Sequence, residues 1–394
     1  MKNAKADWKN LPTLPLFLIL EKLDVPNNLV RFGVVCKYWH SVFNNFLDSK
    51  RRSSLTLVPM LLIPSKKRNI GRKLYSLQAK AKIYSIGLPE SHTKRSFSCC
   101  YGWLAAVDKK LVITLLNPFK GGITIDLPDI EIETYQRSSL GYQHDIKKVF
   151  LSVDPLLHPD DYIVVIIYSI YSKLAFYKPG QRSWIYLDKN IMLIHDVIFY
   201  KNLVYAIGSW NKIVSFDVNI DNLDGTLKSP NLKTVISAQY QRLKDYIYRA
   251  HLFESSKGDL FSIYREWGAV DDNDHLVRFT KNFKVYKLVL DDQSGELLEE
   301  KEVKNINGDI VFVGNNQTLV VSALDFPEAQ PNSIYFTDDY FIGSYYKPYG
   351  PRDIGFFNLK NGSMGKHYQF EPQHTFLSPY IWILPSVKCK LGSA

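Results

Sequence analysis

The stretch Asp7–Phe43, DWKNLPTLPLFLILEKLDVPNNLVRFGVVCKYWHSVF, holds two amphipathic helical patterns in a chain that otherwise reads as strands. Both patterns space apolar residues by three and four, which is typical of a helix buried on one face. They comprise Leu16, Ile19, Leu20 and Leu23, and then Leu29, Phe32, Cys36, Trp39 and Phe43. Between them, Asp24–Asn28 provides a proline and candidate N-cap residues. The sequence predicts a small helical unit that needs a partner, because helices this short bury little apolar surface unaided.

This stretch resembles an F-box, the motif that docks a substrate receptor onto the Skp-type adaptor of a cullin ubiquitin ligase. The matching residues are Leu11-Pro12, Leu16, Ile19-Leu20, Leu23, Leu29, Arg31-Phe32, Val35-Cys36 and Trp39. The resemblance implies three short helices within residues 1–48. It also implies partners, namely the adaptor and, through it, a cullin. The adaptor-binding residues that it implies are Leu11, Pro12, Leu16, Ile19, Leu23, Leu29, Cys36 and Trp39.

One departure from the F-box pattern bears on adaptor binding. Thr13-Leu14-Pro15 stand where the family usually has acidic residues after its Leu-Pro. Pro15 is compatible with a helix only in its first turn. Two alternatives therefore stay open: a helical hairpin that merely caps the domain behind it, or an F-box that no longer recruits the adaptor.

Composition limits the remaining choices. The chain has 394 residues, of which 14% are aromatic, and aromatic residues favour strands. No apolar run approaches the length of a membrane helix, so we expect no membrane partner. Four cysteines are too few for a disulfide framework in a chain this long, which predicts a reducing compartment, the nucleus or the cytoplasm.

Basic residues cluster between Lys50 and Lys73, and the formal net charge is +10. Such a cluster can bind nucleic acid or serve as a nuclear address. Aromatic residues do not interleave Lys66–Lys73 as a stacking platform would require. We interpret residues 49–73 as a basic linker that merges into the first strands of the next domain, and we expect no nucleic-acid partner.

From about Leu55 the chain repeats strands and turns. Ile123–Leu127 and Val214–Ile220 alternate apolar and polar residues, which is the period of a half-exposed strand. The repeating units are Ser98–Leu127, Lys147–Leu187, His195–Ile236, Ala250–Val303 and Asp309–Tyr368, with remnants at Leu55–Pro89 and Tyr380–Pro385. Units of this size are typical of propeller blades. We predict a mainly β fold with six blades, the last closed by strands from both ends; seven blades, or a sandwich or barrel tandem, are the alternatives.

The body also resembles the KIB-type β-propeller of plant F-box proteins, known as domain of unknown function 295. The resemblance implies one propeller over residues 55–394. Matching strings occur in order along the chain: Lys73–Leu77, Leu88–Glu90, Tyr101–Leu104, Leu115–Phe119, Leu174–Phe176, Asp196–Tyr200, Val285–Leu288, Ser322–Pro327 and Ile334–Asp339. Leu297–Glu300 lacks the tryptophan that the family commonly carries there.

Catalytic patterns are missing from the sequence. The histidines have no chelating spacing, and neither a nucleophile elbow nor a phosphate-binding loop is found. Asp271–Asp274 is interpreted as a solvated loop, and Asp338-Asp339 as carboxylates on opposite faces of a strand end. Trp103 and Phe119 are predicted to fill the core. We expect no cofactor, no metal site and no enzymatic activity.

Together these patterns predict a non-catalytic receptor whose propeller binds an unidentified target protein through its loops. The alternative is a propeller scaffold whose F-box does not recruit the adaptor. Exposed tyrosine and arginine are common interface anchors, and one candidate loop is rich in both. The target-binding residues predicted there are Tyr345, Tyr346, Tyr349 and Arg352.

Overall fold

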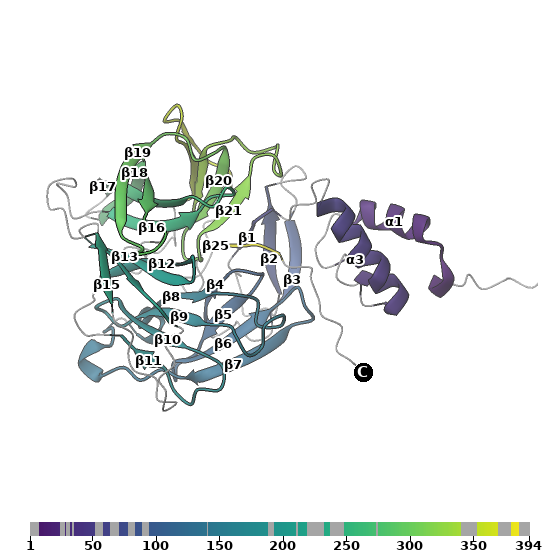
Figure 1. Cartoon of the computed structure of the whole chain (residues 1–394), viewed down its shortest axis with the longest axis horizontal. Helices are drawn as coiled ribbons and strands as arrows, with labels where there is room; N and C mark the ends of the chain where they lie inside the picture. The colour runs from purple at the N-terminus through teal and green to yellow at the C-terminus, as the bar shows by residue number, and fades with distance from the viewer. Residues whose placement is uncertain are drawn as a thin grey trace, which may run out of the picture.

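The computed structural model shows a helical unit beside a six-bladed β-propeller (Figure 1). It describes residues 8–23, 28, 32–33, 35–51, 58–63, 71–77, 83–88, 94–139, 141–187, 193–209, 212–218, 232–236, 248–272, 275–339, 353–368 and 380–385. The predicted mainly β fold and the six blades are confirmed. No helix in these ranges is long and apolar enough to cross a membrane.

The helical unit has its own small core. Its described helices are η1 (Trp8–Asn10), α1 (Thr13–Lys22) and α3 (Lys37–Arg51). The predicted middle helix falls on a stretch of which only residues 28, 32, 33, 35 and 36 are described. The residues buried together are Leu16, Leu20, Phe32, Trp39, Val42, Phe43 and Phe46.

Close contacts as well as burial hold α3 against the segments that precede it. The rings of Phe32 and Trp39 lie 4.5 Å apart. The Trp39 indole also donates a hydrogen bond to the Trp8 carbonyl, 3.2 Å away. A Cβ at Gly33 would lie 2.7 Å from the Phe43 ring, so this close approach requires glycine.

Four of the blades are simple antiparallel meanders whose first strand lies innermost, and each corresponds to one predicted repeating unit. Their strands are β4 (Arg95–Ser98), β5 (Leu104–Val107), β6 (Val112–Asn117) and β7 (Ile123–Asp129); β8 (Ile146–Leu151), β9 (Val164–Tyr168), β10 (Lys173–Tyr177) and β11 (Ile185–Tyr186); β12 (Ile194–Tyr200), β13 (Leu203–Gly208), β14 (Ile213–Phe216) and β15 (Lys233–Ile236); and β16 (Tyr248–Glu254), β17 (Leu260–Asp272), β18 (His275–Leu290) and β19 (Leu297–Val303). Two short helices, η3 (Thr134–Gln136) and η4 (Tyr142–His144), connect β7 to β8.

The next blade departs from the meander. Its strands are β20 (Asp309–Val313), β21 (Leu319–Ser322), β22 (Ser333–Phe336), β23 (Gly355–Asn358) and β24 (Met364–Gly365). Here β21 folds back to lie innermost, and β22 then pairs parallel to β20. The predicted Asn361-Gly362 turn joins β23 to β24, and Gly362 adopts a φ of 70°, a conformation that glycine accepts without strain.

Strands from both ends of the propeller share the remaining blade. It contains β1 (Met60–Ile63), β2 (Gly71–Ser76) and β3 (Ile83–Gly87), with β25 (Ile381–Ile383) innermost. β25 pairs antiparallel with β1, so that Met60 faces Ile383. A β-strand edge that would otherwise be open on β1 is thereby covered.

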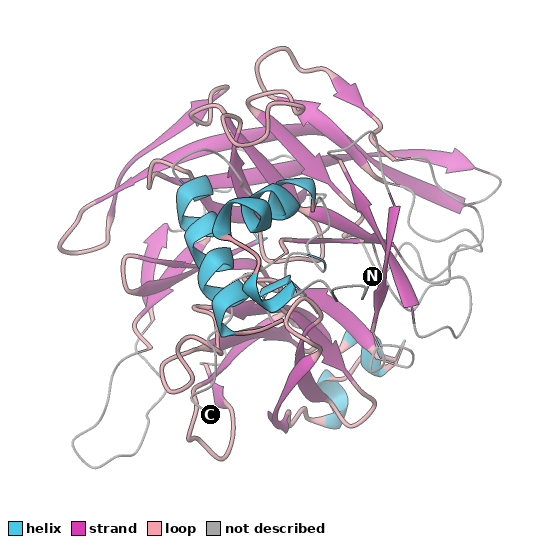
Figure 2. Ribbon diagram, turned by 90° about the vertical axis from the view of Figure 1, so that its right-hand side faces the viewer, coloured by secondary structure: helices cyan, strands magenta, loops and turns pink. Residues whose placement is uncertain are grey.

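The innermost strands form a ring around the propeller axis. β25 contacts β4, β4 contacts β8, β12 contacts both β8 and β16, and β16 contacts β21. Viewed from the side of the helical unit, the blades surround this axis with the helices in front (Figure 2).

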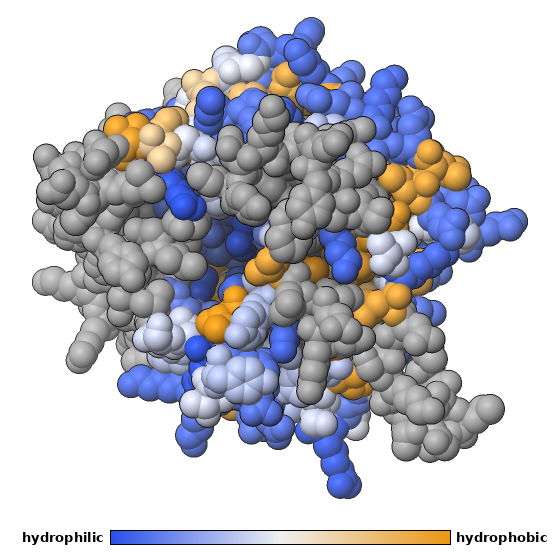
Figure 3. All heavy atoms as spheres, turned by 90° about the vertical axis from the view of Figure 1, so that its left-hand side faces the viewer, coloured by the Kyte–Doolittle hydropathy of each residue, from blue (hydrophilic) through white to orange (hydrophobic). Residues whose placement is uncertain are grey.

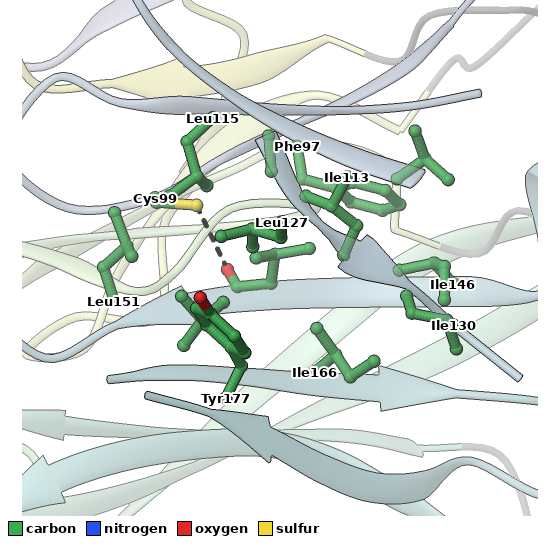
Figure 4. Close-up of a cluster of buried hydrophobic side chains, with 14 of the residues drawn as sticks. Phe97, Cys99, Ile113, Leu115, Leu127, Ile130, Ile146, Leu151, Ile166 and Tyr177 are labelled. Atoms are coloured by element: carbon green, nitrogen blue, oxygen red, sulfur yellow. Dashed lines mark hydrogen bonds between the residues drawn. The ribbon is translucent and has the colours of Figure 1, made fainter. Parts of the chain in front are cut away.

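Apolar side chains fill the spaces between neighbouring blades. Between the blades of β4–β7 and β8–β11, side chains from both sheets meet in one cluster, and the Cys99 thiol lies 3.5 Å from the Val149 carbonyl (Figure 4). Trp103 and Phe119 are buried, which confirms their predicted place in the core. The Trp103 indole donates to Asp154, a buried carboxylate that also pairs with Lys120 at 2.5 Å.

The blade that contains both ends is the clearest point at which to test closure. Trp382 of β25 is fully buried against Phe312, Tyr335 and His367 of the neighbouring blade. We expect Trp382→Ala to lower the free energy of unfolding by about 3–5 kcal/mol, because it removes a large buried ring and leaves a cavity. Urea denaturation followed by circular dichroism measures this change.

Leu324→Ala is the matched control, because Leu324 is 89% exposed and should change stability by less than about 0.5 kcal/mol. Equal effects of the two variants would contradict this account of closure.

Candidate functional site

The predicted adaptor-binding residues divide into two groups. Leu16 and Trp39 are buried inside the helical unit. Leu11, Ile19, Leu23 and Cys36 lie half-buried at the edge of the same cluster, Pro12 is exposed, and Leu29 lies outside the described residues. In this chain Leu16 and Trp39 therefore build the helical unit, and the more exposed residues are the ones available to a partner.

Apolar residues that sequence periodicity did not select are the most exposed. Leu14 is 72% exposed and Leu18 is 53% exposed, one turn apart on α1. Trp8, Val35 and Tyr38 are also exposed, and a Thr13–Tyr38 hydroxyl contact of 3.1 Å joins the starts of α1 and α3. The sequence contained a sign of this exposed surface, because Leu14 and Leu18 are apolar residues that lie outside the stripe of residues spaced for burial.

Pro15 does not interrupt α1. It is the third residue of the helix, and the first intrahelical hydrogen bond runs from the Leu16 amide to the Pro12 carbonyl at 3.4 Å. The amides of a helix's first turn have no intrahelical partner, so the missing N–H of Pro15 costs no bond. Pro15 therefore lies in the first turn of the helix, where a proline is compatible with helical structure.

The propeller axis is filled by a chain of buried charges that the sequence did not predict. Lys148 Nζ lies 2.9 Å from Asp196 Oδ1, and His251 Nδ1 lies 3.6 Å from the other oxygen of that carboxylate. His251 Nε2 is 3.2 Å from Asp339, which also pairs with Arg265 at 2.9 Å. The side chains of these residues are at most 1% exposed, so the charges are stabilised by one another and not by water.

Burial and pairing act in opposite directions on the pKa values of this chain of charges. Burial would raise the pKa of Asp196, but the charges of Lys148 and His251 hold the pKa at about 2. For Asp339, burial likewise opposes ionisation, and Arg265 and His251 bring the pKa well below its ordinary value. Burial lowers the pKa of the Lys148 ammonium, although Asp196 counteracts that effect.

Arg265 connects two blades. Its guanidinium donates to the Thr280 hydroxyl at 2.8 Å, to the Thr337 carbonyl at 2.7 Å and to Asp353 at 2.8 Å, besides Asp339. Thr280 belongs to β18, in the same blade as Arg265. The other partners belong to the next blade, where they follow β22 or precede β23. The Asp339 carboxylate, which follows β22, is engaged by both Arg265 and His251.

The segment just before β21 contacts three inner strands. The Gln317 amide nitrogen donates to the Ser98 carbonyl at 2.9 Å. The Gln317 side-chain oxygen accepts from the Cys100 and Leu151 amides, and its nitrogen donates to the Leu151 carbonyl. Thr318 donates to Asp196 at 3.1 Å. Gln317 thereby connects the ends of β4 and β8 to the segment that leads into β21.

Each end of the propeller has a hollow. One is a cavity of about 270 Å³ on the axis, lined at the exits of the inner strands by Cys100, Ser152, Phe199, Glu254, Gln317 and Leu384. The other is a broad groove of about 1370 Å³ bounded by the β5–β6 turn, residues 130–137 and the β9–β10 turn. Neither holds a catalytic arrangement, and within the described ranges no His, Cys, Asp and Glu cluster is arranged to hold a metal ion.

The predicted target-binding residues Tyr345, Tyr346, Tyr349 and Arg352 lie outside the described residues. They belong to the segment that joins Asp339 to Asp353, the two carboxylates that bind Arg265. Of the predicted basic cluster, Arg72 is buried in the first blade, and burial lowers its pKa to about 10.

The charge chain predicts how stability depends on pH. Asp196 has a pKa of about 2 in the folded protein and about 3.9 when unfolded, so its stabilising effect is complete above pH 4 and is lost as the pH falls toward 2. We expect the urea midpoint to fall over this interval. In the double variant Lys148→Met/Asp196→Asn, the urea midpoint should fall less over this interval. The part of the fall that is due to protonation of Asp339 should remain.

Asp160→Asn, a change at an exposed carboxylate, serves as the control and should keep the wild-type dependence. An unchanged pH dependence in the double variant would show that the Asp196 carboxylate is not held ionised by Lys148.

The comparisons with known proteins agree with this architecture. Residues 74–358 match the KIB1-4 beta-propeller family, and residues 8–49 match the F-box domain. The chain is 24% identical over 410 residues to the F-box protein SKIP23 of Arabidopsis thaliana, covering 96% of this chain and 95% of that protein. It is also 24% identical to the putative F-box protein At5g55150 of the same plant, covering 98% and 99%.

Among solved structures, TolB from Acinetobacter baumannii superimposes with a TM-score of 0.37 and 9% identity, over 84% of this chain and 70% of that one. A superposition this loose says nothing about partners. The family match spans most of the propeller, and the F-box match coincides with the helical unit. The chain belongs to the plant F-box proteins that carry a KIB1-4 beta-propeller.

Proposed function

We propose that this chain is the substrate-recognition subunit of a Skp-cullin-F-box ubiquitin ligase. The helical unit docks a Skp-type adaptor and, through it, a cullin, while the propeller binds a target protein. The chain itself is non-catalytic: it raises the effective concentration of target lysines near the conjugating enzyme. We propose the nucleus or the cytoplasm as its location.

The observation that carries the adaptor half of the proposal is the exposed apolar surface of the helical unit. The unit buries its own core, yet it leaves Leu14 and Leu18 more than half exposed. Exposed apolar side chains gathered on one small element are typical of a docking surface. A helix that binds in a groove commonly contacts it through apolar residues at positions i and i+4, which is the spacing of these two leucines.

The target half of the proposal is supported by the two hollows at the ends of the propeller. They are formed by loops from several blades, as is common for binding sites carried on a rigid scaffold. Figure 1 places the helical unit beside one end of the propeller, so that a target bound at the other end would leave the helices accessible to the adaptor.

The adaptor contact is tested by changing the exposed leucines. We expect Leu14→Asp/Leu18→Asp to weaken binding of a purified plant Skp-type adaptor at least about 100-fold, because two apolar contacts are lost and two charges are buried. Pull-down and calorimetry with the full chain measure this. The matched control is Leu298→Asp/Leu324→Asp, which places the same change on exposed propeller leucines and should leave binding unchanged.

Undiminished adaptor binding by Leu14→Asp/Leu18→Asp would place the contact elsewhere. If the wild-type chain captures neither adaptor nor cullin, the helical unit is a structural cap and the alternative, a propeller scaffold without adaptor, holds.

A separate variant addresses Pro15. Because Pro15 lies in the first turn of α1 and breaks no hydrogen bond, we expect Pro15→Leu to change adaptor affinity by less than about threefold. Calorimetry on the same protein pair checks this. A gain of tenfold or more would instead favour the alternative of a degenerate F-box in which Pro15 is the defect.

A further inference from the structure

Three neighbouring segments expose apolar side chains at the end of the propeller turned away from the helical unit. They are η3, the β9–β10 turn and the residue that precedes β12. The exposed side chains are Tyr135 at 67%, Ile170 at 41%, Tyr171 at 38% and Leu193 at 36%, and we call these four residues the loop patch. Hydrophobic residues gather beside the central hollow on this face (Figure 3). Exposed apolar side chains on adjoining loops are typical of a surface that binds another protein.

Backbone hydrogen bonds join the three segments that carry the loop patch. The Ile170 amide donates to the Gln136 carbonyl at 3.1 Å, and the Leu193 amide donates to the Tyr171 carbonyl at 2.7 Å. The Leu193 carbonyl in turn accepts from the Ser209 amide at 3.0 Å. The loop patch is therefore fixed in place, and a preorganised surface loses little conformational entropy when it binds a partner.

The backbone around the loop patch is strained. Leu193 has a φ of 60°, in the left-handed region that favours glycine and that leucine usually avoids. Ser169 and Ser172, which flank Ile170 and Tyr171, have φ values of 63° and 51°. Such conformations persist only where the surrounding structure imposes them, and they are common at sites that bind a ligand. This strain agrees with a binding role for the exposed side chains.

A buried ammonium lies beside the loop patch. Lys173, the first residue of β10, is 8% exposed, and its Nζ lies 5.6 Å from the centre of the Tyr171 ring. Nζ donates to the Gln136 side-chain oxygen at 3.1 Å, and the Gln136 amide donates to the Tyr135 hydroxyl at 2.8 Å. Within the part of the chain that the structure describes, no carboxylate pairs with this ammonium.

The surroundings of Lys173 differ from those of two other buried lysines. Lys120 is paired with Asp154. Lys148 is paired with Asp196. Lys173 instead donates to a neutral amide oxygen. A buried charge is costly unless it is paired, and an ammonium has three N–H donors, of which the amide takes one. A carboxylate on a bound partner would pair with this charge.

Lys173 and Tyr135 also line the broad groove, so the loop patch continues into it. The volume of the groove, about 1370 Å³, leaves room for a short extended peptide. Its other charged residues have both signs. They are Lys109, Lys110 and Arg137, and Glu131 and Glu133. These residues together select neither sign of charge strongly, so a preference for an anionic segment depends on Lys173.

We infer that the loop patch and Lys173 bind one short segment of the target protein, in which an apolar side chain lies two positions from an aspartate or glutamate. The apolar side chain packs on the loop patch, and the carboxylate accepts a charge-assisted hydrogen bond from Lys173. Side chains two positions apart in an extended peptide share one face and lie about 6.6 Å apart. That spacing is close to the 5.6 Å between the Tyr171 ring and the Lys173 ammonium. The inference rests on the proposed function, since it names the chemistry of the target segment.

The test uses the full chain and fluorescein-labelled peptide pools with amidated C-termini and randomised, non-acidic flanks. The central residues of the first pool are Phe-Ala-Glu in either order. In a second pool Gln replaces Glu, and in a third pool Ser replaces Phe. We expect the first pool to bind at least about tenfold more tightly than either of the others in fluorescence polarisation, because each of the others lacks one of the two contacts.

Lys173→Met keeps the length of the side chain but removes its charge. It should lower affinity for the Glu pool about tenfold, to the level of the Gln pool, and should leave affinity for the Gln pool unchanged. A misfolded variant would lose both affinities. Ile170→Asn should weaken binding of both pools alike, about fivefold, because it removes apolar surface from the loop patch.

The matched controls are Lys257→Met and Leu298→Asn, at exposed positions outside the groove, and they should leave every affinity unchanged. Equal binding of the Glu and Gln pools, or an equal loss in Lys257→Met, would overturn the inference. A Gln pool with a free C-terminal carboxylate that binds as tightly as the Glu pool would also overturn it, because the site would then recognise a chain end. Equal binding of a single-stranded RNA would show a general polyanion surface instead.

Adaptor capture, measured on the same protein samples, lets this inference and the proposed function fail separately. A chain that captures the adaptor but does not distinguish the peptide pools retains the receptor function, and the acidic target segment is then wrong. A chain that prefers the Glu pool but captures no adaptor retains the acidic segment as its ligand, and the ligase role is then wrong.

Discussion

The pairing of β1 with β25 is the constraint on which the rest of the propeller depends. A ring of blades has stable neighbours everywhere only if the first and last blades meet, and here one sheet contains strands from both ends of the domain. Trp382 then locks that sheet against the next blade through its contacts with Phe312, Tyr335 and His367. Without this closure β1 would present a free edge, and the inner ring would open.

Closure has a second consequence, because it encloses polar groups along the axis. The inner strands bring Lys148, Asp196 and His251 together with Arg265 and Asp339, and each charge is satisfied by another. Buried ion pairs add little net stability relative to an apolar core, but a member that loses its partner is costly. Such a chain of charges therefore favours one arrangement of the blades over others.

The two ends of the propeller are unlike. On the side of the helices lies a small cavity among the ends of the inner strands, and the broad groove lies at the other end. The two ends of the propeller therefore differ in size and in the elements that line them. The proposed adaptor contact is assigned to the exposed leucines of α1, and the proposed target contact to the loops around the two hollows.

Periodicity along the sequence predicted the helical hairpin and the strand repeats and favoured six blades, because burial on one face of a helix or strand imposes a local period. It also indicated Trp103 and Phe119 as core residues, whereas the place of Pro15 in the first turn of α1 came from the structure. Only the tertiary structure decided that Leu16 and Trp39 are buried while Leu14 and Leu18 are exposed, since exposure depends on which helices meet. Only it brought Lys148, Asp196 and His251 together, because residues on separate strands have no shared period and converge through the closure of the ring.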